Sequence, residues 1–115
     1  TDGATVQRQI SAVRRLHTAP ALREYVVALV TASRQHPSIR LGASPRAGLH
    51  LLGAARANAA LVGRDHVLPE DVQALAPAVL THRLMLTGEA QLTGRTTGDV
   101  VADILQRTPV PSGRR

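Results

Sequence analysis

The feature that most constrains this chain is a helical spacing of apolar residues that begins just after Pro20. The residues that share this spacing, at i, i+3, i+4, i+7 and i+8, are Leu22, Tyr25, Val26, Leu29 and Val30. The spacing places them on one face of an α-helix. Pro20 suits the first helical turn, where a missing N–H costs little. His36–Pro37 ends the pattern because a residue before proline avoids the helical conformation.

Two other segments show the same kind of periodicity. Near the start of the chain the apolar residues on one face are Val6, Ile10, Val13 and Leu16. A further helix begins with Ser44 as its cap and Pro45 at its first position, and Gly63 suits a left-handed stop. Its expected apolar face consists of Leu49, Leu52, Ala55, Ala59, Ala60 and Val62.

The second half of the chain predicts two more helices. Pro69 opens the first of them, and Pro77 predicts a kink or a break inside it. Its apolar face consists of Val72, Leu75, Ala76, Val79 and Leu80. The segment Thr87–Arg95 is rich in Gly and Thr and is expected to be a loop.

The final helix starts at Thr96, which with Asp99 resembles a capping box. Val100, Val101, Ile104 and Leu105 form its face, and prolines follow. No run of residues alternates with period two. We therefore expect an all-α fold, a small bundle of about five helices.

The composition argues against catalysis by this chain on its own. Its 115 residues fit one domain and include no cysteine, so thiolate metal sites are excluded. A phosphate-binding P-loop needs a Gly-Lys-Ser/Thr ending, and the sequence contains no lysine. The five histidines lie 14 to 19 residues apart, so none forms an i, i+4 metal pair. No apolar run is long enough for a membrane span. No signal peptide is visible in the sequence. The chain starts with Thr1 rather than Met, which indicates a fragment of a longer protein.

The formal net charge of +6 comes almost wholly from arginine. It fits either a polyanionic partner or an ordinary solvated basic surface. A basic helical module that binds nucleic acid or docks to another protein is therefore an alternative function. The arginines are spread along the chain, however, and Tyr25 is the only aromatic residue. Both observations disfavour nucleic acid, because base stacking needs aromatic side chains.

Gly42-Ala43-Ser44-Pro45-Arg46 is the most informative stretch for function. It places Arg46 in the first turn of a helix, where the side chain leans back toward the N-terminus. The guanidinium then lies near the positive end of the helix dipole, and the two together make a plausible anion site. The other interpretation is an ordinary surface arginine after a Ser-Pro cap.

Three blocks of the sequence resemble the MoxR family of AAA+ ATPases. The block Leu41–Ala47 is similar to the sensor-2 motif of that family. The other two blocks, which follow in the family's order and spacing, are Gly63-Arg64-Asp65-His66-Val67-Leu68-Pro69-Glu70-Asp71-Val72 and Val79-Leu80-Thr81-His82-Arg83-Leu84. The likeness covers residues 19–111.

The resemblance implies a C-terminal helical lid over residues 19–111, with a linker or first helix at 1–18 and a tail at 112–115. In such chaperone-like ATPases a separate core domain carries the P-loop and the acids that hold Mg²⁺. The lid covers the bound ATP, and Arg46, positioned by Ser44 and Pro45, would be the sensor-2 arginine that contacts the γ-phosphate. The resemblance also implies a hexameric ring, von Willebrand factor A-type partners and a cytoplasmic location.

The remaining polar residues have simpler interpretations. His82 and Arg83 either contact the core domain or a neighbouring subunit, or form a solvated or buried structural pair. Glu70 and Asp71 are expected to stabilise a helix start through the dipole rather than to act as catalytic carboxylates. Arg64 and Asp65 are interpreted as a local turn pair, and Tyr25 as a core residue.

Overall fold

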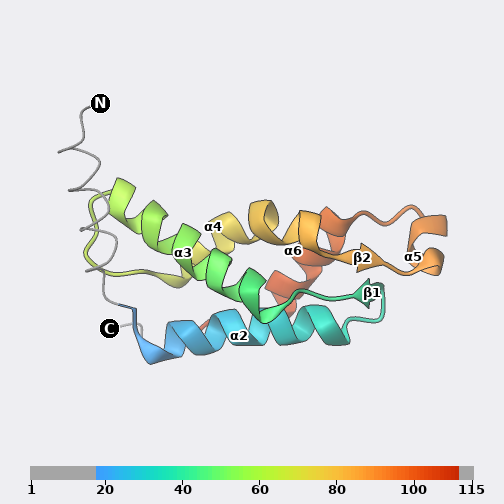
Figure 1. The fold of residues 1–115 in the computed structure, drawn as a ribbon, viewed down its shortest axis with the longest axis horizontal. Coiled ribbons are helices and arrows are strands. Elements are labelled where there is room, and N and C mark those ends of the chain that lie inside the picture. The colour runs from blue at the N-terminus through green and yellow to red at the C-terminus, as the bar shows by residue number, and fades with distance from the viewer. Residues whose placement is uncertain (1–17, 112–115) are drawn as a thin grey trace.

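The computed structural model describes residues 18–111, and these form a helical bundle with a small two-stranded sheet (Figure 1). The elements follow the order α2 (Pro20–Gln35), β1 (Ile39–Leu41), α3 (Pro45–Leu61), α4 (Pro69–Leu80), η1 (Thr81–Arg83), β2 (Met85–Leu86), α5 (Gly88–Leu92) and α6 (Thr97–Arg107). The predicted all-α class is confirmed, and the described residues contain five α-helices, of which α2, α3, α4 and α6 are predicted ones. The apolar face predicted from Val6 to Leu16 and the tail at 112–115 lie outside them.

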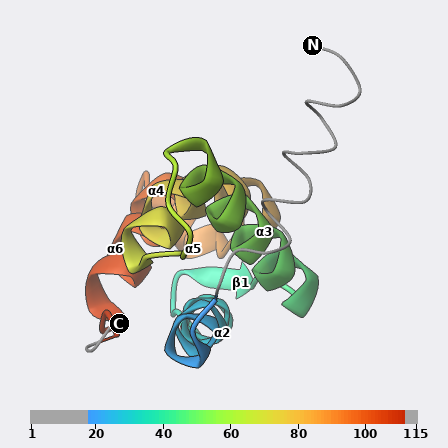
Figure 2. The same cartoon turned by 90° about the vertical axis from the view of Figure 1, so that its left-hand side faces the viewer.

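Helices α2, α3, α4 and α6 enclose the core. Seen end-on they lie around a common centre, α3 packing on α2 and α4, and α6 on the same two helices (Figure 2). The interior is built from small aliphatic side chains, with Tyr25 as a buried core residue at 2% exposure. The largest fully buried apolar side chains are Leu29, Leu51, Leu80, Ile104, Val72, Val100 and Val101.

The predicted face of α3 is partly wrong. Leu49 and Val62 are 70% and 60% exposed, whereas Leu51, which was not predicted, is fully buried. At about 100° per residue, Leu49 lies on the opposite side of the helix from Leu51. The buried residues of α3 form a wider face, because α3 contacts both α2 and α4; they are Ala47, Gly48, Leu51, Leu52, Ala55 and Ala59.

The predicted break at Pro77 does not occur, since α4 continues through Pro77 to Leu80. A proline inside a helix removes one backbone hydrogen bond and costs about 3 kcal/mol. The ring of Pro77 is exposed, while Val72, Ala76 and Leu80 on the same helix are fully buried. We attribute the continuity of the helix to this packing.

The predicted loop Thr87–Arg95 is also partly wrong, because it contains α5. The Thr87 hydroxyl caps this helix by accepting the N–H of Ala90, and Gly94, at φ +81°, follows its end. Just before it, β2 pairs antiparallel with β1, with Ile39 opposite Leu86 and Leu41 opposite Met85. These strands are too short to give a period-two signal. Together with α5 they form one end of the molecule (Figure 1).

Candidate functional site

Arg46 is the second residue of α3, directly after a capped helix start. The Ser44 hydroxyl accepts the N–H of Ala47 at 3.3 Å, and Pro45 occupies the first helical position. The side chain of Arg46 is exposed, and no described residue forms a hydrogen bond or ion pair with its guanidinium. Within the described residues its charge is thus available to a ligand, next to the positive end of the α3 dipole.

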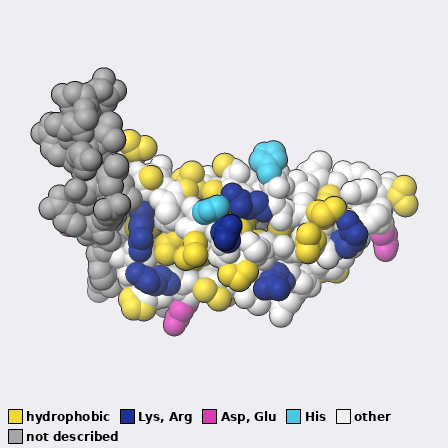
Figure 3. Space-filling view, viewed as in Figure 1, with side chains coloured by type: hydrophobic (Ala, Val, Ile, Leu, Met, Phe, Trp, Pro, Cys, Tyr) yellow, Lys and Arg dark blue, Asp and Glu magenta, His cyan; other side chains and the backbone are white. Residues whose placement is uncertain are grey.

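The sequence on both sides of Arg46 carries no negatively charged residue. Residues 25–64, which include β1 and all of α3, contain no Asp or Glu and hold the arginines Arg34, Arg40, Arg46, Arg56 and Arg64. Sequence reasoning missed this acid-free window, although counting charges along the chain would have found it. Figure 3 shows arginines across this face, with acidic side chains at its lower margin and one end. Such a surface attracts anions.

A shallow groove of about 470 Å³ runs between α2 and α3 beside this helix start. Pro45 lines it, and so do Leu49 and Val27, which are 70% and 63% exposed. Arg23 and Arg34 also line the groove. Its walls therefore combine apolar contact surface with positive charge.

A buried acid, Asp71, ties the end of α3 to the start of α4. Its carboxylate is 1% exposed. It accepts hydrogen bonds from both terminal nitrogens of Arg64, from the side-chain N–H of Asn58 and from the backbone N–H of Leu68. Burial alone would raise the pKa of Asp71, but the hydrogen bonds from Arg64, Leu68 and Asn58 outweigh it and lower this pKa. The prediction that Asp71 stabilises a helix start through the dipole is therefore incomplete, because its carboxylate also connects α3 to α4.

The interpretation of Arg64 and Asp65 as a turn pair is wrong, because the ion-pair partner of Arg64 is Asp71. The carboxylate of Asp65 is exposed and pairs with His66 at 2.8 Å. The predicted stop is confirmed just before this pair: Gly63 has φ +82°, and the N–H of Arg64 reaches back to the Ala59 carbonyl. The left-handed glycine turns the chain so that Arg64 faces α4 rather than its sequence neighbour.

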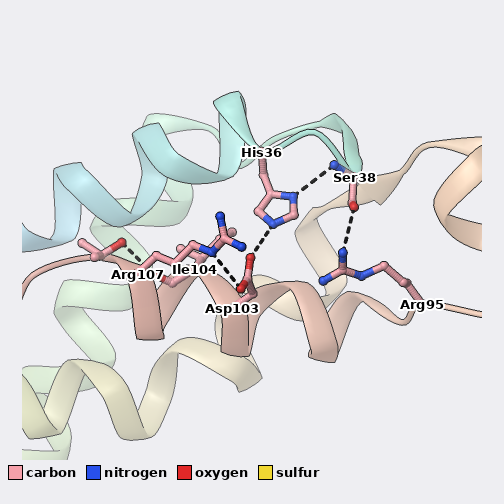
Figure 4. A network of polar contacts seen from close by, with 7 residues as sticks. His36, Ser38, Arg95, Asp103, Ile104 and Arg107 are labelled. Atoms are coloured by element: carbon pink, nitrogen blue, oxygen red, sulfur yellow. Dashed lines mark hydrogen bonds and ion pairs between the residues drawn. The ribbon is translucent and has the colours of Figure 1, made fainter.

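A second polar cluster joins α2 to α6 (Figure 4). His36 Nδ1 accepts the backbone N–H of Ser38 at 3.0 Å, so Nε2 carries the proton and donates to Asp103 at 2.8 Å. The imidazole is 7% exposed. The hydrogen bond from His36, with help from Arg107, lowers the pKa of Asp103. This cluster connects residues far apart in the sequence.

His82 and Arg83 lie in η1, and both side chains are exposed. A buried structural pair is therefore excluded, and a contact with another domain stays a prediction. Among residues 18–111 no three His, Asp or Glu side chains form a group that could hold a metal ion. No helix in this part of the chain is both long and apolar enough to cross a membrane.

Comparisons with known proteins define the class of domain. The profile of the AAA lid domain matches residues 31–104. A solved structure of a candidate ATPase from Cytophaga hutchinsonii superimposes with a TM-score of 0.83 at 31% identity, covering 88% of this chain and 33% of that one. The chain therefore belongs to the AAA lid domain family.

Its sequence relatives place it within that family. Chaperone MoxR1 of Mycobacterium tuberculosis is 39% identical over 79% of this chain and 26% of its own length. Protein YeaC of Bacillus subtilis, which is uncharacterized, is 42% identical over 95% of this chain and 33% of its own. The domain is thus a lid of the MoxR type of AAA+ ATPase, and it spans 26% to 33% of the length of these relatives.

Proposed function

We propose that this lid covers ATP bound to an AAA+ core domain and that Arg46 contacts the γ-phosphate. The observation that carries the proposal is the exposed guanidinium of Arg46, which has no described partner and stands at a capped helix start. The acid-free window around it supports an anionic ligand, and the groove beside it offers apolar contact surface.

Simple electrostatics gives such a contact enough energy to sense the nucleotide. Two unit charges 4 Å apart interact by about 4 kcal/mol at an effective dielectric constant near 20. An arginine that reaches the γ-phosphate therefore distinguishes ATP from ADP. An arginine finger placed on a transferring phosphoryl group contributes on the order of 10³- to 10⁵-fold in rate.

The rest of the ATP site would come from outside this lid. Among the described residues no group of three His, Asp or Glu side chains could hold a metal ion, so we propose that the core domain holds Mg²⁺. We propose that residues 19–111 form the lid and residues 1–18 the link to that core. In the assembled protein we propose a chaperone-like ATPase ring, with His82 and Arg83 available to a neighbouring domain.

The test is Arg46→Ala in a protein that joins this lid to its core domain. We expect kcat for ATP hydrolysis to fall by about 100-fold or more, the effect of losing one charge-stabilising donor, and the preference for ATP over ADP to shrink. Arg56→Ala is the matched control, because it removes the same charge about 15 Å further along α3. Unchanged turnover and unchanged discrimination in Arg46→Ala would overturn the proposal.

The acid-free window is also compatible with a second function, binding of nucleic acid. A labelled duplex that shifts with this domain at low salt, and less at high salt, would support it. We expect no such shift, because the part of the chain that the structure describes holds a single aromatic side chain, Tyr25, and that side chain is buried.

A further inference from the structure

The start of α3 is fixed to the end of α2 by a buried hydroxyl. Ser33, in the last turn of α2, is fully buried. Its Oγ donates to the Val30 carbonyl at 2.6 Å and accepts the backbone N–H of Ala43 at 2.9 Å. Ala43 lies between β1 and α3, where no helix or strand partner serves its N–H, so the Ser33 hydroxyl supplies the acceptor that a buried N–H requires.

Close backbone packing reinforces this bond. A Cβ added at Gly42 would lie 2.6 Å from the Cα of Arg34, so only glycine lets the chain approach α2 here. We call Ser33, Gly42 and Ala43 the latch. Two residues beyond Arg46, Gly48 also packs closely on α2, because an added Cβ would lie 3.1 Å from a methyl of Val30.

The latch and Gly48 hold the backbone on both sides of Arg46. Two residues, Ser44 and Pro45, separate Ala43 from Arg46, and the ring of Pro45 fixes its φ. The direction in which the first turn of α3 leaves α2 is thus set by the hydrogen bond from Ala43 to Ser33. A displacement of that turn would move the guanidinium.

We infer that Ser33 is a positioning residue for Arg46, acting through the latch; the inference rests on the proposed role of Arg46. Misplacement of a catalytic group by about 1 Å can cost on the order of 100-fold in rate. Ser33 is fully buried and offers no surface to a nucleotide, so its effect on hydrolysis would pass entirely through Arg46.

The test is a double-mutant cycle in the protein that joins lid and core. Ser33→Ala should lower kcat by about tenfold and reduce the preference for ATP over ADP. In the Arg46→Ala background the same change should have no further effect on kcat, because residues that act as a unit are not additive. An equal loss in both backgrounds would overturn the inference.

Thr108→Val is the matched control for the loss of a buried hydroxyl. Thr108 is 9% exposed, and its hydroxyl donates to the Ile104 carbonyl at 2.7 Å on α6, as Ser33 does on α2. We expect this variant to lose stability but to keep kcat within about twofold, since it lies away from the start of α3. A fall of kcat equal to that of Ser33→Ala would assign the effect to stability and overturn the inference.

Ser33→Thr keeps the test decisive if Ser33→Ala fails to fold. It retains the hydroxyl, and a folded Ser33→Thr protein should show turnover within about threefold of the parent. A folded variant as slow as Arg46→Ala would contradict the inference. If Arg46→Ala itself leaves turnover unchanged, the proposed function fails. If Arg46→Ala is slow and Ser33→Ala is not, only the positioning role fails.

Discussion

Both terminal nitrogens of Arg64 donate hydrogen bonds to the carboxylate of Asp71, which is buried between the end of α3 and the start of α4. The fork of the guanidinium matches the two oxygens, and Asn58 and the backbone of Leu68 occupy the remaining acceptor positions. The ion pair is therefore fully hydrogen-bonded, which is the condition under which a buried charge is tolerated.

Removal of this carboxylate should destabilise the domain strongly. We expect Asp71→Ala to lower the free energy of unfolding by about 3 kcal/mol, because Arg64 and the N–H groups around it lose their acceptor. Urea unfolding followed by circular dichroism measures the change. Asp65→Ala is the control, since that carboxylate is 99% exposed, and its midpoint should match the parent. Equal midpoints for the Asp71 and Asp65 variants would contradict this account.

The same carboxylate should make the fold sensitive to acid. The pKa of Asp71 is lowered in the folded chain, so the unfolded chain binds the proton more readily. Its contribution to stability is complete above the unfolded pKa of about 3.9 and is lost as the pH falls through the lower folded pKa. Urea midpoints from pH 7 to pH 2 should therefore drop in the acid range, and less steeply for Asp71→Asn. Parallel curves for parent and variant would refute the linkage.

The His36 cluster should contribute measurably to the packing of α6 on α2. His36→Ala removes the acceptor of the Ser38 N–H and the donor to Asp103. We expect a loss of about 2 kcal/mol, the cost of leaving part-buried polar groups without partners. Thermal unfolding measures it, with His50→Ala, an exposed histidine on α3, as the control. A loss no larger than that of His50→Ala would show that the cluster contributes little.

Gly42 and Gly53 each stand between Leu and Ala in the sequence. Replacing them by alanine should change the free energy of unfolding in opposite directions. Gly42→Ala forces a Cβ against the Arg34 backbone and should destabilise the domain by about 2 kcal/mol. Gly53, inside α3, has no heavy atom within 4 Å of an added Cβ, so Gly53→Ala should stabilise it by about 0.5 to 1 kcal/mol. Unfolding midpoints that shift in the same direction would contradict the close approach at Gly42.

The sequence predicted the features that depend on neighbouring residues. The Ser44 cap, the left-handed Gly63 and the Thr96–Asp99 capping box each involve residues within four positions of one another. The start of the α3 helix and the place of Arg46 follow from such local signals. The nucleotide role of Arg46, by contrast, came from resemblance and stays a proposal.

Features that depend on the tertiary arrangement could not be predicted. His36 meets Asp103 across 67 positions, and the strand pair joins segments that carry no repeating pattern. The exposure of Leu49 follows from the placement of α3 between two helices, which periodicity alone does not reveal. The latch was missed for the same reason, because Ser33 has an unremarkable sequence context until α3 is folded against α2.

The polar clusters described above lie toward opposite ends of the bundle, one where α3 passes to α4 and the other where α2 ends beside α6 (Figure 1). Between them they link all four long helices, and the latch adds a third link from α2 to α3. We expect a domain braced in this way to move as one body. If Arg46 contacts a phosphate as proposed, its approach or withdrawal would carry the groove and the exposed face of η1 through the same rotation. A single charge contact would then displace an entire surface.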